Sequence, residues 1–274
     1  MLGLLAQRAA QLGQFEQFDS LLREASRFRE TFSEPSEQTR RPAPVRLAHG
    51  PSGPRLLCFP SFASRSGAHQ YARLAAAARG KLDVWALPAP GFTGGEELPA
   101  DLDALVRLHA QDVERCADGE PFAILGHSAG GWIAHAVTAQ LEKLGIPPVR
   151  LVLLDSYRPG SAILPRIQAS LARELTVDQG SLAAAGEQWD DICLTAMGGC
   201  ARLFESWQPQ QPSTPVLQVR AAEPLPGFPE TGWQASWQGA GHTEVEVPGN
   251  HFTMTGEHGD STLRAVLDHL AAQP

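Results

Sequence analysis

The sequence predicts an α/β domain whose mostly parallel sheet is covered by helices on both faces. Short apolar runs of strand length alternate with Ala- and Leu-rich stretches of helical length over most of the 274 residues. Such an order places each strand parallel to its neighbour, with the crossover helices on the two faces of the sheet. The apolar content of 43% is enough for the core that this architecture requires.

The first 32 residues predict two short helices on either side of Gly13. Apolar side chains recur on each helix at spacings of three and four residues, so each helix carries one apolar stripe. Helices this short are unstable alone. Each stripe must therefore be covered, either by the rest of the chain or by a second copy in a dimer, and the periodicity leaves both open. The stripes contain Leu2, Leu5, Ala9 and Leu12, then Phe15, Phe18, Leu22 and Ala25.

Residues 33–46 are polar and rich in proline, which predicts a linker, and residues 47–274 then form the main domain. Within that domain, an apolar insertion of helical composition over about residues 158–212 is placed to form a lid above the strand ends. The predicted helices include Ala68–Ala78 and Leu102–Cys116. The strand-like runs are Arg55–Pro60, Asp83–Leu87, Phe122–Leu125, Arg150–Leu154, Pro215–Val219 and Thr243–Val247.

Composition and charge argue against several classes of protein. The formal net charge of -8 disfavours nucleic acid as a partner, because a phosphate backbone requires a clustered basic face. No apolar run approaches the roughly 18 residues that span a bilayer, and the N-terminus lacks a signal-peptide pattern. We therefore expect no membrane partner and a cytoplasmic location.

The four cysteines show no CxxC pair and no zinc-like spacing, so we expect reduced thiols, no metal site and no cofactor of the chain's own. Cys200 is a weak alternative nucleophile, because no strand-to-helix turn surrounds it. The cysteines are Cys58, Cys116, Cys193 and Cys200.

The strongest local signal is the segment Gly126-His127-Ser128-Ala129-Gly130. A GxSxG pattern alone is weak, but here the apolar run FAIL leads into it and the helical stretch GWIAHAVTAQLEKLG follows. This strand, tight turn and helix form the nucleophile elbow of α/β-hydrolases. The turn raises the serine hydroxyl above the sheet and tolerates only small neighbours. The sequence therefore predicts the α/β-hydrolase fold with Ser128 as nucleophile.

A serine nucleophile needs a base, and nine histidines compete for that role. His251 lies in the loop after the last predicted strand, from which this fold brings in its base, and we predict that it is the base. His127 adjoins the serine, but we expect its side chain to project away from the hydroxyl and to serve packing. The other candidates lie within helices or away from that loop: His109, His135, His242 and His258.

Two carboxylates compete to orient the base. Asp155 ends the strand after the elbow, and Glu223 follows the run Pro215–Val219, where many hydrolases keep their acid. The topology leaves them nearly tied. The composition slightly favours Asp155, since Glu223 stands in a Pro-rich loop.

The negative charge that develops during acyl transfer needs two backbone amides. One should belong to Ala129, directly after the nucleophile. The other should come from the loop after the first main-domain strand, from Phe62 or Ala63.

Six segments that cover most of residues 55–260, among them the FAILGHSAGGWIAHA stretch around Ser128, resemble the thioesterase domain that ends type I modular polyketide synthases. The resemblance implies that Asp155 is the triad acid and that Phe62 supplies the second oxyanion amide. It also implies a homodimer through residues 1–32 and an acyl channel roofed by the lid. The matching segments cover most of residues 55–260 and are CFPSFASRSGAHQYARLA, LPAPGFTGGEELP, FAILGHSAGGWIAHA, LVLLDSYRPG, ARLFESW and VPGNHFTMTGEH.

The resemblance further implies that an acyl carrier protein delivers a finished polyketide as a thioester on its phosphopantetheine arm. The chain would pass to Ser128 and then either to water, giving an acid, or to its own hydroxyl, giving a macrolactone. The sequence leaves both outcomes open. Alternative enzymes are a stand-alone editing thioesterase and a carboxylesterase or lipase, and an alternative of another class is a non-catalytic dimerisation module with a decayed site.

Overall fold

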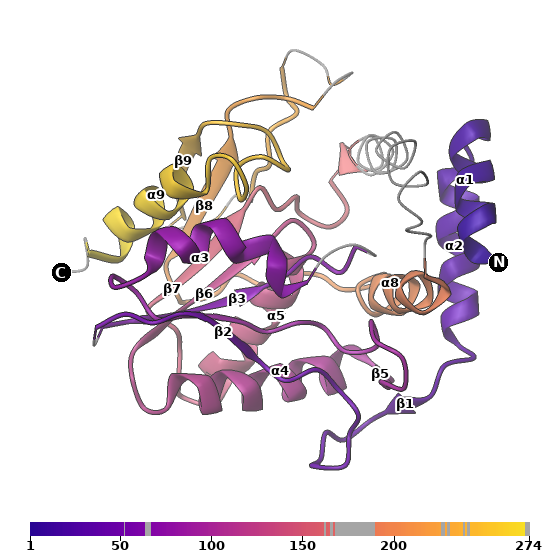
Figure 1. Cartoon of the computed structure of the whole chain (residues 1–274), viewed down its shortest axis with the longest axis horizontal. Coiled ribbons are helices and arrows are strands. Elements are labelled where there is room, and N and C mark those ends of the chain that lie inside the picture. The colour runs from indigo at the N-terminus through magenta and orange to yellow at the C-terminus, as the bar shows by residue number, and fades with distance from the viewer. Residues whose placement is uncertain are drawn as a thin grey trace.

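The central sheet has seven strands in the order β2-β4-β3-β6-β7-β8-β9 (Figure 1). All neighbours pair in parallel except β2 and β4, which are antiparallel. The computed structural model describes residues 1–51, 53–63, 67–161, 163–164, 167, 190–225, 228, 231–237, 239 and 242–271. The strands are β2 (Val45–Ala48), β3 (Arg55–Phe59), β4 (Val84–Ala86), β6 (Phe122–His127), β7 (Arg150–Leu154), β8 (Val216–Ala221) and β9 (His242–Val247).

The predicted α/β class with a mostly parallel sheet is confirmed, and all six runs predicted as strands lie in this sheet. β2 was not predicted, and it begins inside the range 33–46 that we expected to be a linker. Its sequence carries a weak signal for a physical reason. The strand is four residues long at the edge of the sheet, and only Ala48 is buried, so it lacks the apolar run of a central strand.

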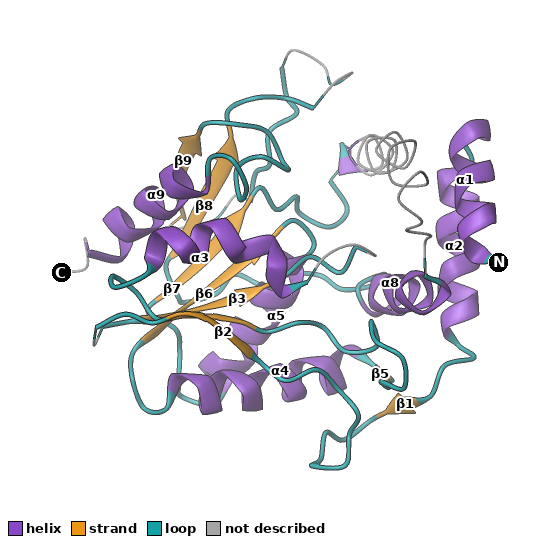
Figure 2. Cartoon of the chain, viewed as in Figure 1, coloured by secondary structure: helices purple, strands orange, loops and turns teal. Residues whose placement is uncertain are grey.

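Helices cover both faces of the sheet (Figure 2). α3 (Ala72–Ala78) and α9 (Gly259–Ala271) pack together on one face. α4 (Leu102–Ala117) and α5 (Gly130–Lys143) pack together on the other. No helix in the described ranges is long and apolar enough to cross a membrane.

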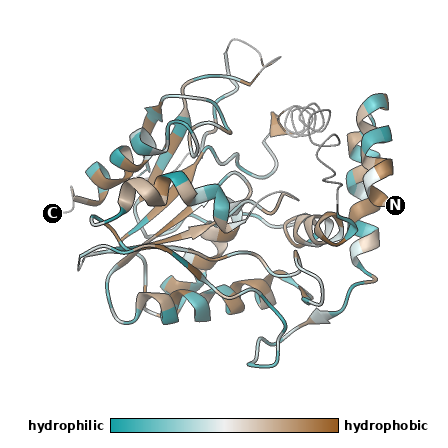
Figure 3. Ribbon diagram, viewed as in Figure 1, coloured by the Kyte–Doolittle hydropathy of each residue, from teal (hydrophilic) through white to brown (hydrophobic). Residues whose placement is uncertain are grey.

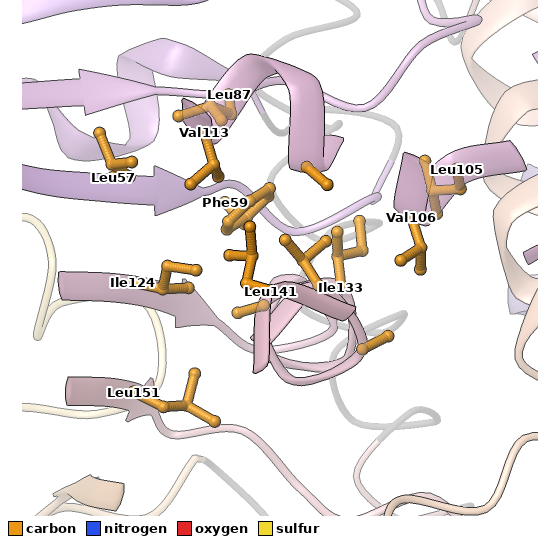
Figure 4. Packing of buried hydrophobic residues seen from close by; sticks show 14 of the residues in the cluster. Leu57, Phe59, Leu87, Leu105, Val106, Val113, Ile124, Ile133, Leu141 and Leu151 are labelled. Carbon is orange, nitrogen blue, oxygen red and sulfur yellow. The ribbon is translucent and has the colours of Figure 1, made fainter. Parts of the chain in front are cut away.

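Alternate side chains of the central strands fill two separate cores, as the twofold period of a strand requires. Phe59 belongs to the core beneath α4 and α5, where Figure 4 shows it among Val113, Ile133 and Leu141. Its neighbour Cys58 belongs to the core on the α3 and α9 side. Because both faces are buried, the central strands are apolar along most of their length (Figure 3).

The two predicted N-terminal helices are α1 (Leu2–Leu12) and α2 (Phe15–Ser26). They lie at one end of the molecule, against α8 (Asp191–Leu203), a helix of the predicted insertion (Figure 1). The same chain therefore covers part of the apolar surface of these helices.

The contact between α2 and α8 is a close approach of two backbones. Leu22 of α2 is fully buried. A Cβ atom placed on Gly198 of α8 would overlap the carbonyl group of Leu22, so this position requires glycine. Ala6 and Ala9 of α1 are also buried.

Arg29, three residues after α2, joins three segments of the chain. Its guanidinium donates to Thr195 Oγ1 at 2.9 Å and to the carbonyl oxygen of Ile192 at 3.1 Å, both on α8. It also donates to the carbonyl oxygens of Gly91 at 2.9 Å and Glu96 at 3.1 Å. One side chain thus ties the end of α2 to α8 and to the loop that precedes β5 (Leu98–Pro99).

The predicted linker is attached to the surface of the main domain. Just before it, β1 (Thr31–Phe32) pairs in parallel with β5. Within it, Arg41 donates to Asp112 of α4 at 2.8 Å, and that carboxylate is buried. Several of the lid residues predicted over 158–212, namely 162, 165–166 and 168–189, lie outside the described residues.

We expect Gly198→Ala to loosen the contact between α2 and α8, because the new methyl group overlaps backbone atoms that no rotamer change can move. Overpacking of this kind costs about 1–3 kcal/mol of stability. Amide hydrogen exchange should rise across residues 15–26, and the unfolding midpoint should fall. Gly53→Ala is the matched control, since a Cβ atom there meets nothing within 4 Å. Equal effects of the two substitutions would contradict the close contact.

Candidate active site

Ser128 occupies the turn between β6 and α5. Its φ angle of 54° lies in the left-handed region, which is uncommon for residues other than glycine. Its N–H group donates to the carbonyl oxygen of Leu154 at 2.9 Å, which ties the turn to the end of β7. This is the tight strand-to-helix turn that the motif predicts, and it places Ser128 at the carboxyl edge of the sheet.

Two glycines make this turn possible. A Cβ atom on Gly126 would overlap the carbonyl group of Gly130. A Cβ atom on Gly130 would in turn overlap the carbonyl oxygen of Phe59, at the end of the neighbouring strand β3. The predicted need for small residues at these positions therefore has a specific cause, which is backbone contact on both sides of the serine.

The structure brings Asp155 and His251 together. The Nδ1 atom of His251 lies 2.8 Å from Oδ2 of Asp155. Both side chains are buried, with exposed fractions of 5% and 0%. The other carboxylate oxygen accepts a hydrogen bond from the N–H group of Ala221 at 3.3 Å. With Nδ1 engaged by the carboxylate, Nε2 is the ring nitrogen that remains to act as a base.

The alternative acid, Glu223, lies on the surface. Its side chain is exposed, and its N–H group donates to the carbonyl oxygen of Gly249 at 3.0 Å. Asp155 is therefore the carboxylate that the fold places against His251. Its own φ angle of 40° is also left-handed, and its N–H group donates to Val219 of β8 at 2.8 Å.

Two tryptophans hold the segment that follows Asp155. Trp132 of α5 donates from Nε1 to the carbonyl oxygen of Tyr157 at 2.7 Å. Trp237 donates from Nε1 to the carbonyl oxygen of Ser156 at 2.6 Å. Two uncharged donors thus fix the loop that carries the Asp155 carboxylate. The sequence contains no local signal for these two hydrogen bonds.

The loop after β3, which contains Phe62, lies beside the start of α5. Phe59 pairs with Gly126 in the sheet register, and Gly130 abuts the backbone of Phe59 and Pro60. The two predicted oxyanion residues, Phe62 and Ala129, therefore come from segments that adjoin each other.

His127 makes polar contacts that the sequence did not predict. Its Nε2 atom lies 2.9 Å from the carbonyl oxygen of His251, and its Nδ1 atom contacts the side-chain amide of Gln70. Its backbone N–H group donates to the hydroxyl of Tyr71 at 3.2 Å, and that hydroxyl donates to the carbonyl oxygen of Phe59 at 2.7 Å. The predicted packing role of His127 is therefore incomplete.

The sequence of residues 54–273 matches the family described as Thioesterase domain. The chain belongs to this family. Several relatives are polyketide synthase proteins. The spectinabilin polyketide synthase system protein NorC of Streptomyces orinoci is 48% identical over 97% of the chain and 12% of NorC. Polyketide synthase GfsE of Streptomyces halstedii is 44% identical over 97% of the chain and 7% of GfsE. The chain thus spans 12% or less of the length of these relatives.

Solved thioesterase domains share the fold. The NocB thioesterase domain from the nocardicin cluster superposes with a TM-score of 0.63 at 21% identity, covering 84% of this chain and 99% of that one. The Vlm2 thioesterase domain bound with a dodecadepsipeptide gives a TM-score of 0.60 at 20% identity, covering 83% and 97%. These likenesses support the α/β-hydrolase fold for the chain.

Cys200, the alternative nucleophile, is not reactive in the thioesterase domain. Cys200 is fully buried in α8, and burial raises the pKa of its thiol to about 12, so the thiolate is not available at neutral pH. Within the part of the chain that the structure describes, no group of three or more His, Cys, Asp or Glu side chains is arranged to hold a metal ion.

Three histidines of the thioesterase domain are buried as neutral rings. Burial lowers the pKa of His109 and of His127 to about 3 and that of His135 to about 4. The positive charge of Arg41 lowers the pKa of His109 further. Neither ring nitrogen of His109 has a hydrogen-bond partner among the described residues.

We expect the domain to lose stability as the pH falls from 6.5 toward 4, because these rings stay neutral when folded but take up protons when unfolded. Above the unfolded pKa both states carry neutral rings, so this stability is fully present there. Below it, each ring lowers the free energy of unfolding by about 1.4 kcal/mol per pH unit. Denaturant unfolding at several pH values measures this slope.

His109→Leu should reduce that slope by the contribution of one proton, since leucine removes the titrating ring. His49→Gln is the control, because His49 is exposed. A slope unchanged by His109→Leu would show that this ring is already protonated in the folded domain.

Proposed function

We propose that this domain releases the acyl chain of a polyketide synthase, with Ser128, Asp155 and His251 as its catalytic triad. The proposal rests on the contact between Asp155 and His251. This contact orients the imidazole as a base, and it lies at the same edge of the sheet as the turn of Ser128. Asp155 directly follows Leu154, the residue to which the Ser128 amide is bonded. The polyketide synthase relatives support the substrate class.

In the proposed first half-reaction, Oγ of Ser128 attacks the thioester carbonyl carbon while Nε2 of His251 takes the hydroxyl proton. The C–S bond then breaks, and His251 returns the proton to the departing sulfur. An ester on Ser128 remains. The Nδ1–H group of His251 donates a hydrogen bond to Asp155 throughout the reaction. The carboxylate thereby stabilises the imidazolium without taking its proton.

The proposed oxyanion hole consists of the backbone amides of Phe62 and Ala129. Ala129 stands at the start of α5, where the first amides of the helix lack partners within the helix. Two amides held in advance at this point stabilise the charge on the tetrahedral oxygen as it develops. The close backbone contact at Gly130 supports the pairing of these two segments.

In the second half-reaction, His251 takes a proton from the incoming nucleophile and returns it to Oγ of Ser128 as the ester breaks. Water as nucleophile gives a free acid, and a hydroxyl of the acyl chain gives a macrolactone. Both outcomes use the same residues. The choice between acid and macrolactone depends on whether water or a hydroxyl of the acyl chain reaches the ester first.

The proposed partner is an acyl carrier protein of the same synthase, which holds the acyl chain on its phosphopantetheine arm. The relatives in polyketide synthase proteins support this partner. The proposed chemistry needs no cofactor of the chain's own, because side chains and backbone amides perform every step.

An aromatic cluster joins the proposed oxyanion loop to α5 and to the insertion. The ring of Phe62 stacks on Phe204, at the end of α8, with centroids 5.9 Å apart and planes within 5°. Trp132 contacts both rings, and Trp207 forms a T-shaped pair with Phe204, with centroids 5.2 Å apart. Phe62 and Phe204 are buried in this cluster, so the packing of their rings fixes the loop that carries the proposed oxyanion amide of Phe62.

A homodimer through residues 1–32 is part of this proposal. α8 covers part of α1 and α2, but large apolar side chains of both helices remain exposed. Large exposed apolar side chains, where they gather, mark interaction surfaces, and four such residues come from this one pair of packed helices. They are Leu4 at 70%, Leu12 at 51%, Leu5 at 43% and Leu21 at 42% exposed.

We expect Asp155→Asn to lower the turnover of an acyl-pantetheine thioester by about 10⁴-fold, because the amide cannot hold the base in its working tautomer. Glu223→Gln is the matched control, since it removes the same charge at an exposed position. Mass spectrometry should detect the acyl ester on Ser128 in the wild type and none in Ser128→Ala. Comparable losses in the two carboxylate variants would refute the assignment of the acid, and faster turnover of simple esters than of thioesters would favour a carboxylesterase.

We expect the double substitution Leu5→Lys with Leu12→Lys to convert a dimer of 29.4 kDa chains into monomers, because the lysines place charges in the apolar contact. Sedimentation velocity measures the mass. Leu144→Lys, at a side chain 55% exposed just after α5, is the control and should leave the dimer intact. A wild-type chain that sediments as a monomer would overturn the dimer.

A further inference from the structure

The ring of His127 lies between the loop that carries His251 and Gln70 of the short 3-10 helix Ala68–Tyr71, and it contacts both. It is 4% exposed, and its centroid lies 4.6 Å from that of the His251 ring. On one side its Nε2 atom faces the carbonyl oxygen of His251 at 2.9 Å. On the other side its Nδ1 atom faces the side-chain nitrogen of Gln70.

These contacts determine the protonation state of the ring. A carbonyl oxygen can only accept, so Nε2 of His127 must carry the hydrogen. The side-chain nitrogen of Gln70 can only donate, so Nδ1 must be the bare, accepting nitrogen. A doubly protonated ring would set an N–H group against the amide N–H of Gln70. Only the neutral ring with hydrogen on Nε2 satisfies both neighbours.

The side chain of Gln70 continues the series of hydrogen bonds. Its oxygen accepts from the backbone N–H group of Ser61 at 3.2 Å, which agrees with the amide orientation that His127 requires. Ser61 directly precedes Phe62 in the proposed oxyanion loop. Three hydrogen bonds in series therefore join that loop to the backbone of His251.

We propose that His127 is a positioning residue, which as a neutral ring protonated on Nε2 holds the His251 backbone and, through Gln70, aligns it with the oxyanion loop. This inference rests on the triad proposed above. His251 then has two anchors, since Asp155 fixes its ring and His127 fixes its carbonyl group. The two anchors together define where Nε2 of His251 points.

The surroundings of His127 agree with a neutral ring. The ionisable groups that face it are His251, Asp155 and Tyr71, whose hydroxyl accepts from the His127 backbone. Burial and the neighbouring His251 lower the pKa of His127 to about 3, although the charge of Asp155 opposes the shift. A neutral neighbour avoids a second positive charge beside His251 when His251 becomes an imidazolium during the reaction.

The first test is nitrogen-15 NMR of the histidine rings in the 274-residue chain between pH 5 and 8, with His127→Gln used to assign the signals. We expect His127 to show a protonated Nε2 and a bare Nδ1 over the whole range. A ring protonated on Nδ1, or one that becomes doubly protonated in this range, would overturn the proposal. This readout does not depend on activity, so it stands even if the proposed function fails.

The second test compares kinetics with an acyl-pantetheine thioester. His127→Phe fills the space without a donor, and we expect kcat to fall by about 10- to 100-fold with KM within about twofold, as for a misplaced catalytic group. His127→Gln restores an N–H group near the position of Nε2 and should recover part of that loss. Gln70→Met removes the middle of the series and should lower kcat by a smaller factor.

A wild-type kcat in both His127→Phe and Gln70→Met would overturn the positioning role while leaving the triad intact. Loss of activity in His127→Phe together with no recovery in His127→Gln would assign the effect to packing and would also overturn it. If His127→Phe does not fold, kcat of His127→Gln is compared with kcat of Gln70→Met. We expect the higher kcat in His127→Gln, because it keeps an N–H donor near the carbonyl oxygen of His251, and the reverse order would overturn the positioning role.

Discussion

The hydrogen bond between Asp155 and His251 joins groups 96 residues apart in the chain, and the arrangement of the whole site depends on it. It forms because parallel strands end at one edge of the sheet, so that Asp155 after β7 and the loop after β9 meet across the end of β8. Both side chains are buried, so each must find its hydrogen-bond partner in the other and not in water. Any change in the register of these strands would separate them.

The serine turn follows from the same edge by a different constraint. Its position is determined by backbone contacts that exclude a Cβ atom, at Gly126 within the turn and at Gly130 against β3. The turn, the carboxylate loop and the histidine loop are then linked by donors that carry no charge, among them Trp132, Trp237 and His127. Neutral donors suit the proposed mechanism, in which His251 becomes an imidazolium, because they add no competing charge.

The sequence predicted the features that arise from local patterns. Apolar runs located six strands, and the glycine-flanked motif identified the turn at Ser128. The order of the strands placed Asp155 and His251 at the same edge but left Glu223 as an alternative acid. The family resemblance favoured Asp155, and the structure places Asp155 against His251 and Glu223 on the surface. The features that were missed arise between segments far apart in the chain. The edge strand β2 has too few buried residues to produce a pattern, and the bonds of Gln70 to Ser61 and to His127 require three-dimensional proximity that no periodicity encodes.

The packing of α2 on α8 bears on where the functional unit begins. The family match starts at residue 54, yet the chain before it supplies β2 as the partner of β4 and Leu22 as the cover of Gly198. A protein trimmed at residue 54 would leave β4 with an unpaired backbone edge, prone to pairing with other chains. It would also strip Arg29 from α8 and expose an apolar helix surface to water. The physical border of this enzyme therefore lies well upstream of residue 54, where the family match begins.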